Sequence, residues 1–376
     1  MKVLMISFTS LIQEMYHGKP REIAKFPGVK LTLLVPPYWK ELWSDRKREL
    51  ELRYADDYSI EVAPTLFTGN LHLSVFKKKI GKLPRDLQPD IIDIEDEPFN
   101  AGSAQIVYLR NRLAPRCRIV MHASQNDFKR YPFPFSMIER YSFRNVSAFL
   151  ARNGEAKAIL ERKGFHGRIE IVPHGVDPDQ FVWTRDTSRA SLGWPETFTI
   201  GYIGAIASHK GLDTLVQAVR TLPCRLVFIG DGSFKSEIEK LARELAVDRR
   251  LSMLPAIPHR EVPKYLAAMD VFVLPSRSVK NWREKFGRVL IEAMAARVPI
   301  VGSDSGEIPT VLGDAGLIFP ENDVKMLEAR LKFLIENPDE RVRLAEKGYE
   351  RVQAYYSWKV VARKTYSVYK SVLEEA

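Results

Sequence analysis

Glu284-Lys-Phe-Gly-Arg-Val-Leu-Ile-Glu292 joins a polar loop to an apolar, helix-forming run. The dipeptide Phe286-Gly287 interrupts the loop, and the pattern predicts a helix that begins at about Arg288. The first turn of a helix presents unpaired backbone N–H groups and a partial positive charge, which together suit a diphosphate. Gly287 has no Cβ, so phosphate oxygens can approach the backbone closely. The segment therefore predicts a phosphate-binding loop at the edge of an α/β sheet.

Short apolar runs alternate with helical patterns on both sides of this segment. In the second half of the chain these runs are Phe198–Tyr202, Arg225–Ile229, Val271–Leu274 and Pro299–Gly302. In the first half they are Lys2–Phe8, Val29–Val35, Ile91–Ile94, Arg118–His122 and Ala148–Ala151. Near-continuous apolar strands separated by helices favour a parallel sheet covered on both faces. The predicted fold class is therefore α/β, with two Rossmann-like domains that face each other across a ligand-binding cleft.

The join between the domains is predicted at His174-Gly-Val-Asp-Pro-Asp-Gln-Phe-Val182. Its glycine, proline and polar residues suit an exposed connector. We therefore expect a first domain over residues 1–175 and a second domain over residues 176–357. The amphipathic helix at 358–376 is expected to pack back onto the first domain.

The composition is that of a globular protein, since 45% of the 376 residues are hydrophobic and 28% are charged. Apolar runs such as Asp270–Pro275 are far too short to cross a bilayer, and Met1–Ser7 is expected to be a buried strand rather than an export signal. Cys117 and Cys224 lack metal-ligand spacing and are expected to be reduced core thiols. A cytoplasmic protein is predicted. Despite the net charge of +10, no nucleic-acid module is recognisable, so no nucleic-acid partner is expected.

Basic and apolar residues alternate in one stretch, Leu71–Arg85. Its cations are Lys77, Lys78, Lys79, Lys82 and Arg85. A segment of this kind can lie on an anionic membrane surface, which would place the protein peripherally on the inner face of a membrane. It is equally typical of an ordinary amphipathic helix with a solvated polar face, and the sequence leaves both interpretations open.

The two glutamates of the opening segment suggest separate roles. Glu292 lies more than one turn into the predicted helix, where its carboxylate could accept both hydroxyls of a ribose. Glu284 lies in the loop and would point toward a donor sugar. The alternative is that both are solvated acidic residues around a surface helix.

The spacing of Glu284 and Glu292 around Phe-Gly resembles the Glu-x7-Glu motif of retaining glycosyltransferases with two Rossmann-like domains, family 4 in particular. Further segments in the same order are similar to signatures of that family over roughly residues 198–320: Gly201-Tyr-Ile-Gly204 with Lys210-Gly-Leu-Asp-Thr-Leu, Val227–Gly232, Asp270–Ser276 and Gly306-Glu-Ile-Pro309. Each is short, but their joint order and spacing make the resemblance specific.

The resemblance implies a donor site for a UDP- or GDP-sugar in the second domain. Lys210 would pair with the diphosphate and stabilise the leaving group, and Glu284 would hold the sugar hydroxyls. Glu292 would bind the ribose, and the base would lie near Leu254–Ile257. The groups expected to hold the phosphates are Gly204, Phe286, Gly287, Arg288 and Val289. For Lys210 the alternative is an exposed lysine in a turn.

One position departs from the family pattern. The family usually carries an arginine directly after the second glycine of the phosphate loop, where this chain has Ala205. A cationic partner of the diphosphate is missing there, and Arg288, Lys285 or Arg277 are the candidates to replace it.

The first domain offers fewer signals. His122 ends a predicted strand, at the place where related enzymes keep a cleft histidine that contacts the donor sugar. A histidine that satisfies a buried backbone group is the alternative. Glu97 and Asn126 follow strand ends as well and are candidate residues on the acceptor side.

No metal constellation is visible in the sequence, and no cofactor is expected. Asp90-Ile-Ile-Asp93 has the wrong spacing for the Asp-x-Asp signature with which other glycosyltransferases hold a divalent ion. A metal-independent reaction is therefore predicted. The resemblance to family 4 implies that this reaction is a retaining hexosyl transfer to an acceptor hydroxyl. Two alternatives remain open: a non-catalytic sugar-nucleotide binder, favoured by Ala205, and a sugar-nucleotide epimerase.

Overall fold

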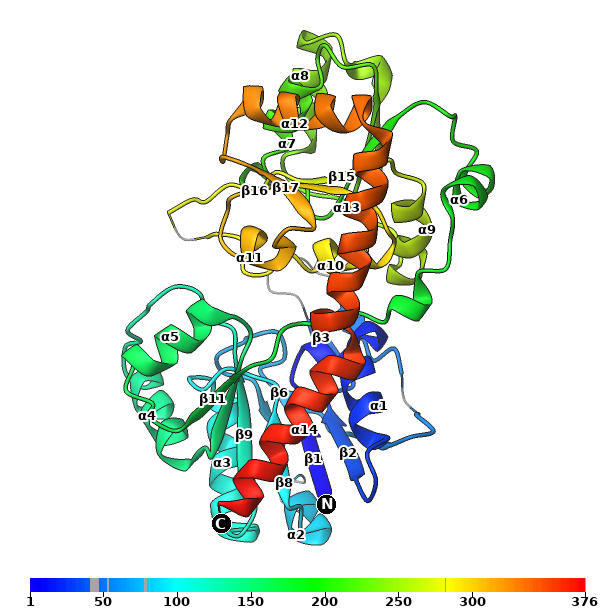
Figure 1. Ribbon diagram of the computed structural model, residues 1–376. Coiled ribbons are helices and arrows are strands. Elements are labelled where there is room, and N and C mark those ends of the chain that lie inside the picture. The colour runs from blue at the N-terminus through cyan, green and yellow to red at the C-terminus, as the bar shows by residue number, and fades with distance from the viewer. Residues whose placement is uncertain (41–46, 53, 78–79, 81, 281, 376) are drawn as a thin grey trace. The chain divides into compact units, whose positions relative to one another are not determined.

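The computed structural model describes the whole chain except residues 41–46, 53, 78–79, 81, 281 and 376 (Figure 1). It divides into two compact units. The first comprises Met1–Gly175 together with Trp358–Ala376, and the second comprises Val176–Ser357. Each unit has its own hydrophobic core.

The first unit contains a seven-stranded parallel sheet in the order β11-β10-β9-β8-β1-β2-β5. The strands are β1 (Lys2–Ile6), β2 (Lys30–Val35), β5 (Ser59–Val62), β8 (Ile91–Ile94), β9 (Arg118–Ala123), β10 (Ala148–Ala151) and β11 (Arg168–Ile171). Strands β8 and β10 are buried along their whole length. This explains the continuous apolar run of β10, whereas β8 contains the buried Asp93 among its isoleucines. Small antiparallel pairs link β3 (Tyr38–Lys40) with β4 (Lys47–Glu49), and β6 (Thr65–Leu66) with β7 (Val75–Phe76).

The helices of this unit are α1 (Gly18–Ala24), α2 (Lys82–Leu87), α3 (Ala101–Leu113), α4 (Phe135–Asn145), α5 (Gly154–Arg162) and the C-terminal α14 (Trp358–Glu374). Helix α14 packs on α1 and on the sheet through an apolar face that includes Val361, Val368 and Val372. Its first residue, Trp358, fills the space beside Gly18, where a Cβ would lie only 2.0 Å from the indole ring.

The second unit contains a six-stranded parallel sheet in the order β14-β13-β12-β15-β16-β17. Its strands are β12 (Thr199–Ile203), β13 (Arg225–Ile229), β14 (Leu251–Leu254), β15 (Val271–Leu274), β16 (Ile300–Ser303) and β17 (Gly316–Phe319). Its helices are α6 (Arg185–Leu192), α7 (Leu212–Ala218), α8 (Lys235–Glu244), α9 (Val262–Ala267), α10 (Arg288–Ala295), α11 (Ile308–Leu312), α12 (Val324–Glu336) and α13 (Pro338–Arg351). The predicted α/β class with two parallel sheets is confirmed.

The basic stretch Leu71–Arg85 is not one amphipathic helix, so that interpretation is wrong. It contains the short strand β7 and the start of α2. Phe76 and Ile80 are buried in the core of the first unit, whereas Leu71 and Leu73 are exposed. Lys78 and Lys79 lie outside the described residues.

In the part of the chain that the structure describes, no helix has the length and apolar character required to cross a bilayer. Cys117 and Cys224 are both buried and unbridged. Burial raises the pKa of Cys224 to about 11, so this thiol stays protonated at neutral pH.

Candidate active site

Helix α10 begins at Arg288, where the sequence predicted it. Its N-cap is Gly287, which has a φ of 72°. A Cβ there would lie 2.9 Å from the Leu290 side chain and would sit on a backbone conformation that L-residues rarely adopt. Gly287 has no side chain to cap the helix, so the N–H groups of the first turn can serve a ligand.

Glu284 is buried beside this helix start and is held from two sides. Its Oε2 accepts hydrogen bonds from Lys210 Nζ at 2.7 Å and from Ser276 Oγ at 3.0 Å. Its backbone oxygen accepts the Glu307 N–H at 3.0 Å. A Cβ on Gly306 would lie only 2.1 Å from the same oxygen. The Gly306-Glu-Ile-Pro segment therefore positions the loop that carries Glu284.

Lys210 ends a short 3-10 turn, Ser208–Lys210, at the start of α7. Its ammonium lies 4.5 Å from the centre of the Trp282 ring in addition to its pairing with Glu284. His209 lies on the same turn as Lys210, and the centres of the His209 and Trp282 rings are 4.0 Å apart. Lys210 is thus partly buried and paired, and the alternative of an exposed turn lysine is wrong. Sequence reasoning missed Trp282, which no local motif marks.

Glu292 is also buried, one turn into α10. Its Oε1 lies 3.0 Å from both Arg288 Nε and His259 Nε2. Burial alone would raise the pKa of Glu292, but the Arg288 charge and the His259 hydrogen bond hold it below its usual range. The carboxylate is therefore charged at neutral pH and able to accept hydroxyl hydrogens. The alternative of two solvated glutamates is wrong.

The other residues predicted to bind the diphosphate lie after β12 and at the start of α10. Gly204 follows β12 with a φ of 155°, and a Cβ on Gly230 would lie 1.9 Å from its carbonyl oxygen. Phe286 is buried, and Val289 is partly buried in the first turn of α10.

The structure also shows what surrounds Ala205, where the family has arginine. The Ala205 carbonyl accepts the Tyr202 hydroxyl at 2.8 Å. Of the candidate replacements, Arg277 pairs with Asp213, Arg288 pairs with Glu292, and Lys285 is exposed. Any of these three side chains that binds the diphosphate would therefore approach it from a different part of the site than an arginine at position 205.

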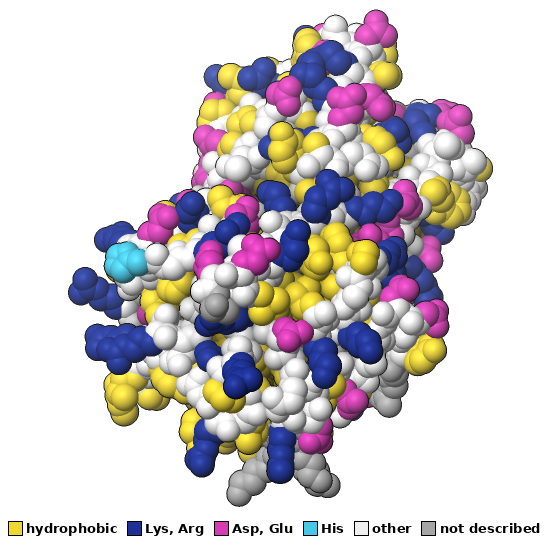
Figure 2. All heavy atoms as spheres, turned by 60° about the horizontal axis from the view of Figure 1, so that its bottom comes forward, with side chains coloured by type: hydrophobic (Ala, Val, Ile, Leu, Met, Phe, Trp, Pro, Cys, Tyr) yellow, Lys and Arg dark blue, Asp and Glu magenta, His cyan; other side chains and the backbone are white. Residues whose placement is uncertain are grey.

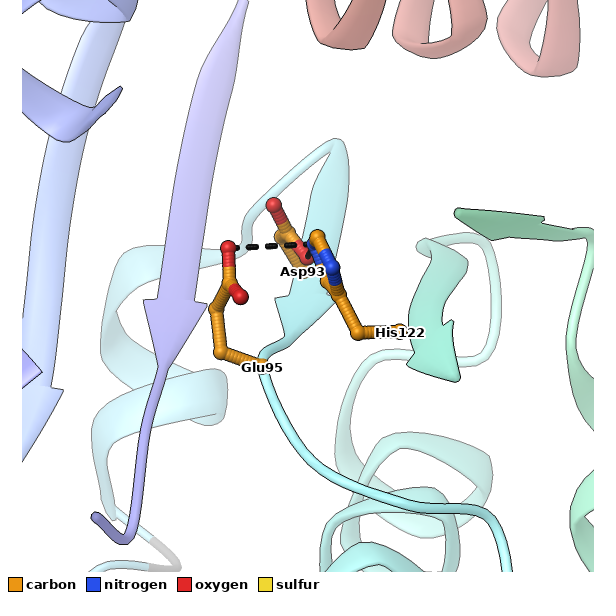
Figure 3. Close-up of side chains that lie close together, drawn as sticks. All are labelled: Asp93, Glu95 and His122. Carbon is orange, nitrogen blue, oxygen red and sulfur yellow. Dashed lines mark ion pairs between the residues drawn. The ribbon is translucent and has the colours of Figure 1, made fainter. Parts of the chain in front are cut away.

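The first unit carries its own charged cluster at the carboxyl ends of β8 and β9. His122 Nε2 lies 3.0 Å from Glu95 Oε1 and 3.4 Å from Asp93 Oδ1 (Figure 3). Lys19 Nζ lies 2.8 Å from both Asp93 Oδ2 and His122 Nε2, and it also pairs with Glu95. Arg152 donates to Glu95 Oε2 at 2.7 Å. His122 is therefore bound to side chains rather than to a buried backbone group, and Lys19 and Arg152 are partners that the sequence did not reveal.

The charged groups of this cluster shift the pKa values of their neighbours. Burial alone would raise the pKa of Glu95, but His122, Lys19 and Arg152 hold it well below its usual range. The Tyr369 hydroxyl of α14 donates to Asp93 Oδ2 at 2.5 Å. Burial and the Asp93 charge raise the pKa of Tyr369 well above its usual value, so the phenol stays a donor.

Asp93, Glu95 and His122 are the one group of described residues close enough to share a metal ion. The Lys19 ammonium already lies among their ligand atoms and supplies a positive charge there. A metal would have to displace it.

Glu97 and Asn126 have neighbours in the loops that follow β8 and β9. Glu97 Oε1 accepts the Ser124 N–H at 2.8 Å and the Ser124 hydroxyl at 2.5 Å, which ties the two loops together. Asn126 is buried, and its Oδ1 accepts from Asn153 Nδ2 at 3.1 Å. Asn153 also caps α5, so both candidates take part in the architecture of this sheet edge.

Two Rossmann-like units, one of them with a glycine-started helix flanked by buried carboxylates, define the GT-B fold class of nucleotide-sugar enzymes. Residues 184–351 match the family model described as glycosyl transferases group 1, and residues 28–180 match the one described as Glycosyltransferase Family 4. The chain belongs to this family of glycosyltransferases, as its motifs predicted.

One curated relative is the GDP-mannose-dependent monoacylated alpha-(1-6)-phosphatidylinositol monomannoside mannosyltransferase of Corynebacterium glutamicum. It is 28% identical over 221 residues, which cover 55% of this chain and 58% of the relative, so the chain spans a little over half of its length.

Two solved structures share the fold. Sucrose-phosphate synthase from Thermosynechococcus elongatus has a TM-score of 0.73 at 18% identity and covers 100% of both chains. Anabaena Alr3699/HepE in complex with UDP has a TM-score of 0.75 at 15% identity, covering 99% of this chain and 100% of that one.

Proposed function

We propose that this chain transfers a hexosyl group from a nucleoside-diphosphate sugar to an acceptor hydroxyl, with retention of the donor's anomeric configuration, in the biosynthesis of a glycan, glycolipid or polysaccharide. The observation that carries the proposal is the pair of buried glutamates, Glu284 and Glu292, on either side of Gly287 at the start of α10. A buried carboxylate on each side of a helix start that can bind a diphosphate suits a ligand with hydroxyls at both of its ends.

In this proposal the second unit, residues 176–357, binds the donor. The N–H groups of Gly287–Val289 and the Lys210 ammonium hold the diphosphate, and Gly204 leaves room for it. Glu292 accepts the ribose hydroxyls, and Glu284 accepts hydroxyls of the sugar. Lys210 and Glu284 are bonded to each other at 2.7 Å, so phosphate and sugar recognition share one contact.

In the chemical step the bond between the sugar carbon and the diphosphate oxygen breaks as the acceptor oxygen bonds to the same carbon from the same face. The acceptor proton passes to an oxygen of the departing diphosphate. Lys210, Arg288 and the dipole of α10 balance the negative charge that develops on the leaving group. This route needs no protein nucleophile.

The first unit, residues 1–175 with α14, is the proposed acceptor side. Glu97 and Asn126 follow the carboxyl ends of β8 and β9, where ligands of parallel α/β sheets bind. His122, near the end of β9, is the residue of this unit proposed to contact the donor sugar. We expect a cytoplasmic protein with peripheral contact to an anionic membrane if the acceptor is carried on a lipid. The Corynebacterium relative, named for a phosphatidylinositol mannoside, supports a glycolipid acceptor.

A screen of UDP- and GDP-sugars by thermal shift identifies the donor, because a ligand bound only to the folded state raises its stability. The selected donor is then incubated with acceptor fractions, and the released nucleoside diphosphate and the anomer of the product are measured. Binding without release would identify a non-catalytic binder, and a changed sugar without transfer would identify an epimerase. An inverted product would contradict retention.

A further inference from the structure

The first unit contains a cationic pocket that includes none of the residues proposed to bind the donor. A cavity of about 430 Å³ opens between the loop at 128–131, helix α4 and the end of α5. The cations that line it are Lys129, Arg130, Arg140, Arg162 and Lys163. Figure 2 shows several Lys and Arg side chains at its left edge, the side on which Figure 1 draws α4 and α5.

The charges of this pocket are not balanced. The one acidic side chain in its lining is Glu139, and Lys163 Nζ already pairs with it at 2.6 Å. Lys163 is also bound to Gln125 Oε1 at 3.0 Å. The other four cations make no ion pair with a residue that the structure describes. Four exposed cationic residues without an ion pair among the described residues therefore line one cavity, and their summed charge favours anions there.

Several side chains that line the pocket are held in place by neighbouring groups, as expected of a site that binds one ligand. The Arg162 guanidinium lies 4.0 Å from the centre of the Phe128 ring, a contact that holds its planar fork in one orientation. Tyr131 is fixed by Gln125, whose Nε2 donates to its hydroxyl at 3.0 Å. Ser136, in the first turn of α4, adds a hydroxyl to the lining.

We infer that this pocket binds a phosphate group of a second ligand in the first unit. Arginine forks pair with phosphate oxygens through parallel charge-assisted hydrogen bonds, and here three arginines share the pocket with two lysines. Under the proposed function, on which this assignment of the ligand rests, the phosphate belongs to the acceptor. The group is either the headgroup of a lipid-borne acceptor or the phosphate of a soluble one.

The test measures the binding of inorganic pyrophosphate by calorimetry at low salt. The background is Lys210→Ala, which weakens the phosphate site proposed in the second unit. We expect one remaining site, and we expect Arg130→Gln with Arg140→Gln to weaken it at least tenfold, since two charge-assisted contacts are lost. Arg144→Gln is the matched control, because Arg144 is an exposed arginine of α4 outside the pocket lining. Equal affinity in the double variant and the control overturns the inference.

A second arm separates the two sources of phosphate. Vesicles of phosphatidylcholine with phosphatidic acid are compared with vesicles of phosphatidylcholine alone. If the double variant loses both pyrophosphate and phosphatidic acid vesicles, the ligand is a lipid headgroup. If only pyrophosphate binding falls, it is a soluble phosphate. Nucleotide affinity, measured in the same double variant with Lys210 intact, is expected to stay unchanged, so failure of the donor site and failure of this pocket are distinguishable.

Discussion

Each unit of the molecule holds two buried carboxylates that are paired with cations, and the two clusters differ in how exposed their side chains are. In the first unit Lys19, Asp93, Glu95 and His122 have side chains that are at most 4% exposed. In the second unit the cations around Glu284 and Glu292 are partly open, with Lys210 16% and Arg288 29% exposed. The closed cluster is held by ion pairs among its own members, although Asp93 Oδ1 and His122 Nδ1 are buried without a hydrogen-bond partner among the described residues. The more exposed cations of the other cluster can exchange their partners for a ligand.

The difference separates stability from ligand binding. The first cluster is linked to α14 through Tyr369, so it connects the C-terminal helix to the sheet that it covers. The second cluster is linked to the helix start at Gly287, where a ligand would meet backbone N–H groups. We therefore expect substitutions in the first cluster to act mainly on folding and those in the second to act mainly on nucleotide binding.

The largest expected effect is on stability, from Lys19→Ala. The substitution leaves Asp93 and Glu95 buried with less compensation, and breaking a buried ion pair costs about 3–5 kcal/mol. Denaturant unfolding followed by circular dichroism measures the loss. Lys25→Ala is the control, because Lys25 pairs with Glu22 at the surface, where such a pair contributes about 0–1 kcal/mol. Similar losses in both variants would contradict the closed-cluster interpretation.

The next effect concerns nucleotide affinity, from Glu292→Ala. If its carboxylate accepts ribose hydroxyls, each lost bond weakens binding by about 1.5–3 kcal/mol. Glu284→Ala should lower turnover more than affinity for the nucleoside diphosphate alone. Calorimetry with the diphosphate and steady-state kinetics separate the two, and Glu350→Ala, an exposed site in the same unit, serves as control. Unchanged nucleotide affinity in the Glu292 variant would remove this site assignment.

Acid should distinguish the clusters as well. The folded-state pKa of Glu95 lies well below its usual value of 4.5, so its contribution to stability is complete above pH 4.5 and is lost as the pH falls toward the folded pKa. Glu292 shifts in the same direction. Because more cations surround Glu95, we expect Glu95→Gln to flatten the acid limb of stability against pH more than Glu292→Gln does. Unfolding free energies measured from pH 6 downward would show it, and equal slopes would speak against it.

The sequence predicted one cluster far better than the other, for a physical reason. Glu284, Gly287 and Glu292 lie within one continuous loop and helix, so their relation is local and readable from spacing. Lys19 meets Asp93 and Glu95 across separate elements, through a pairing that only the folded sheet creates. His122 was recognisable because it ends a strand, but its partners were not.

The same contrast holds for packing. Parallel strands were predictable because both of their faces are buried and their sequences are therefore largely apolar. The basic stretch Leu71–Arg85 was read as either a membrane segment or a helix, since alternating charge gives no unique period. Phe76 and Ile80 are buried in the core of the first unit, and packing against residues distant in the sequence leaves no local sequence pattern.

A smaller effect is expected for membrane binding by the exposed cations of the stretch Leu71–Arg85. Lys77 and Arg85 are exposed, and each could contribute about 1 kcal/mol near an anionic membrane. With Phe76 and Ile80 packed inside, apolar insertion would be left to Leu71 and Leu73. We therefore expect weak binding to anionic vesicles that fades with salt, and little to neutral ones. Changing Lys77, Lys78 and Lys79 to Gln should reduce co-sedimentation without altering the thermal midpoint. A wild type that ignores anionic vesicles at low salt would show the stretch to be a solvated face.

The smallest expected effect is that of a chelator, for which we predict no change in transfer. In the first unit Lys19 lies among Asp93, Glu95 and His122, the group of described residues close enough to share a metal ion, and in the second unit Lys210 pairs with Glu284. Lys210, Arg288 and the α10 dipole together supply the positive charge that the leaving diphosphate needs. Activity is measured with and without excess EDTA, then after adding Mg²⁺ or Mn²⁺. Activity lost to EDTA and restored by either ion would show that the lysine in the open cluster does not replace a metal.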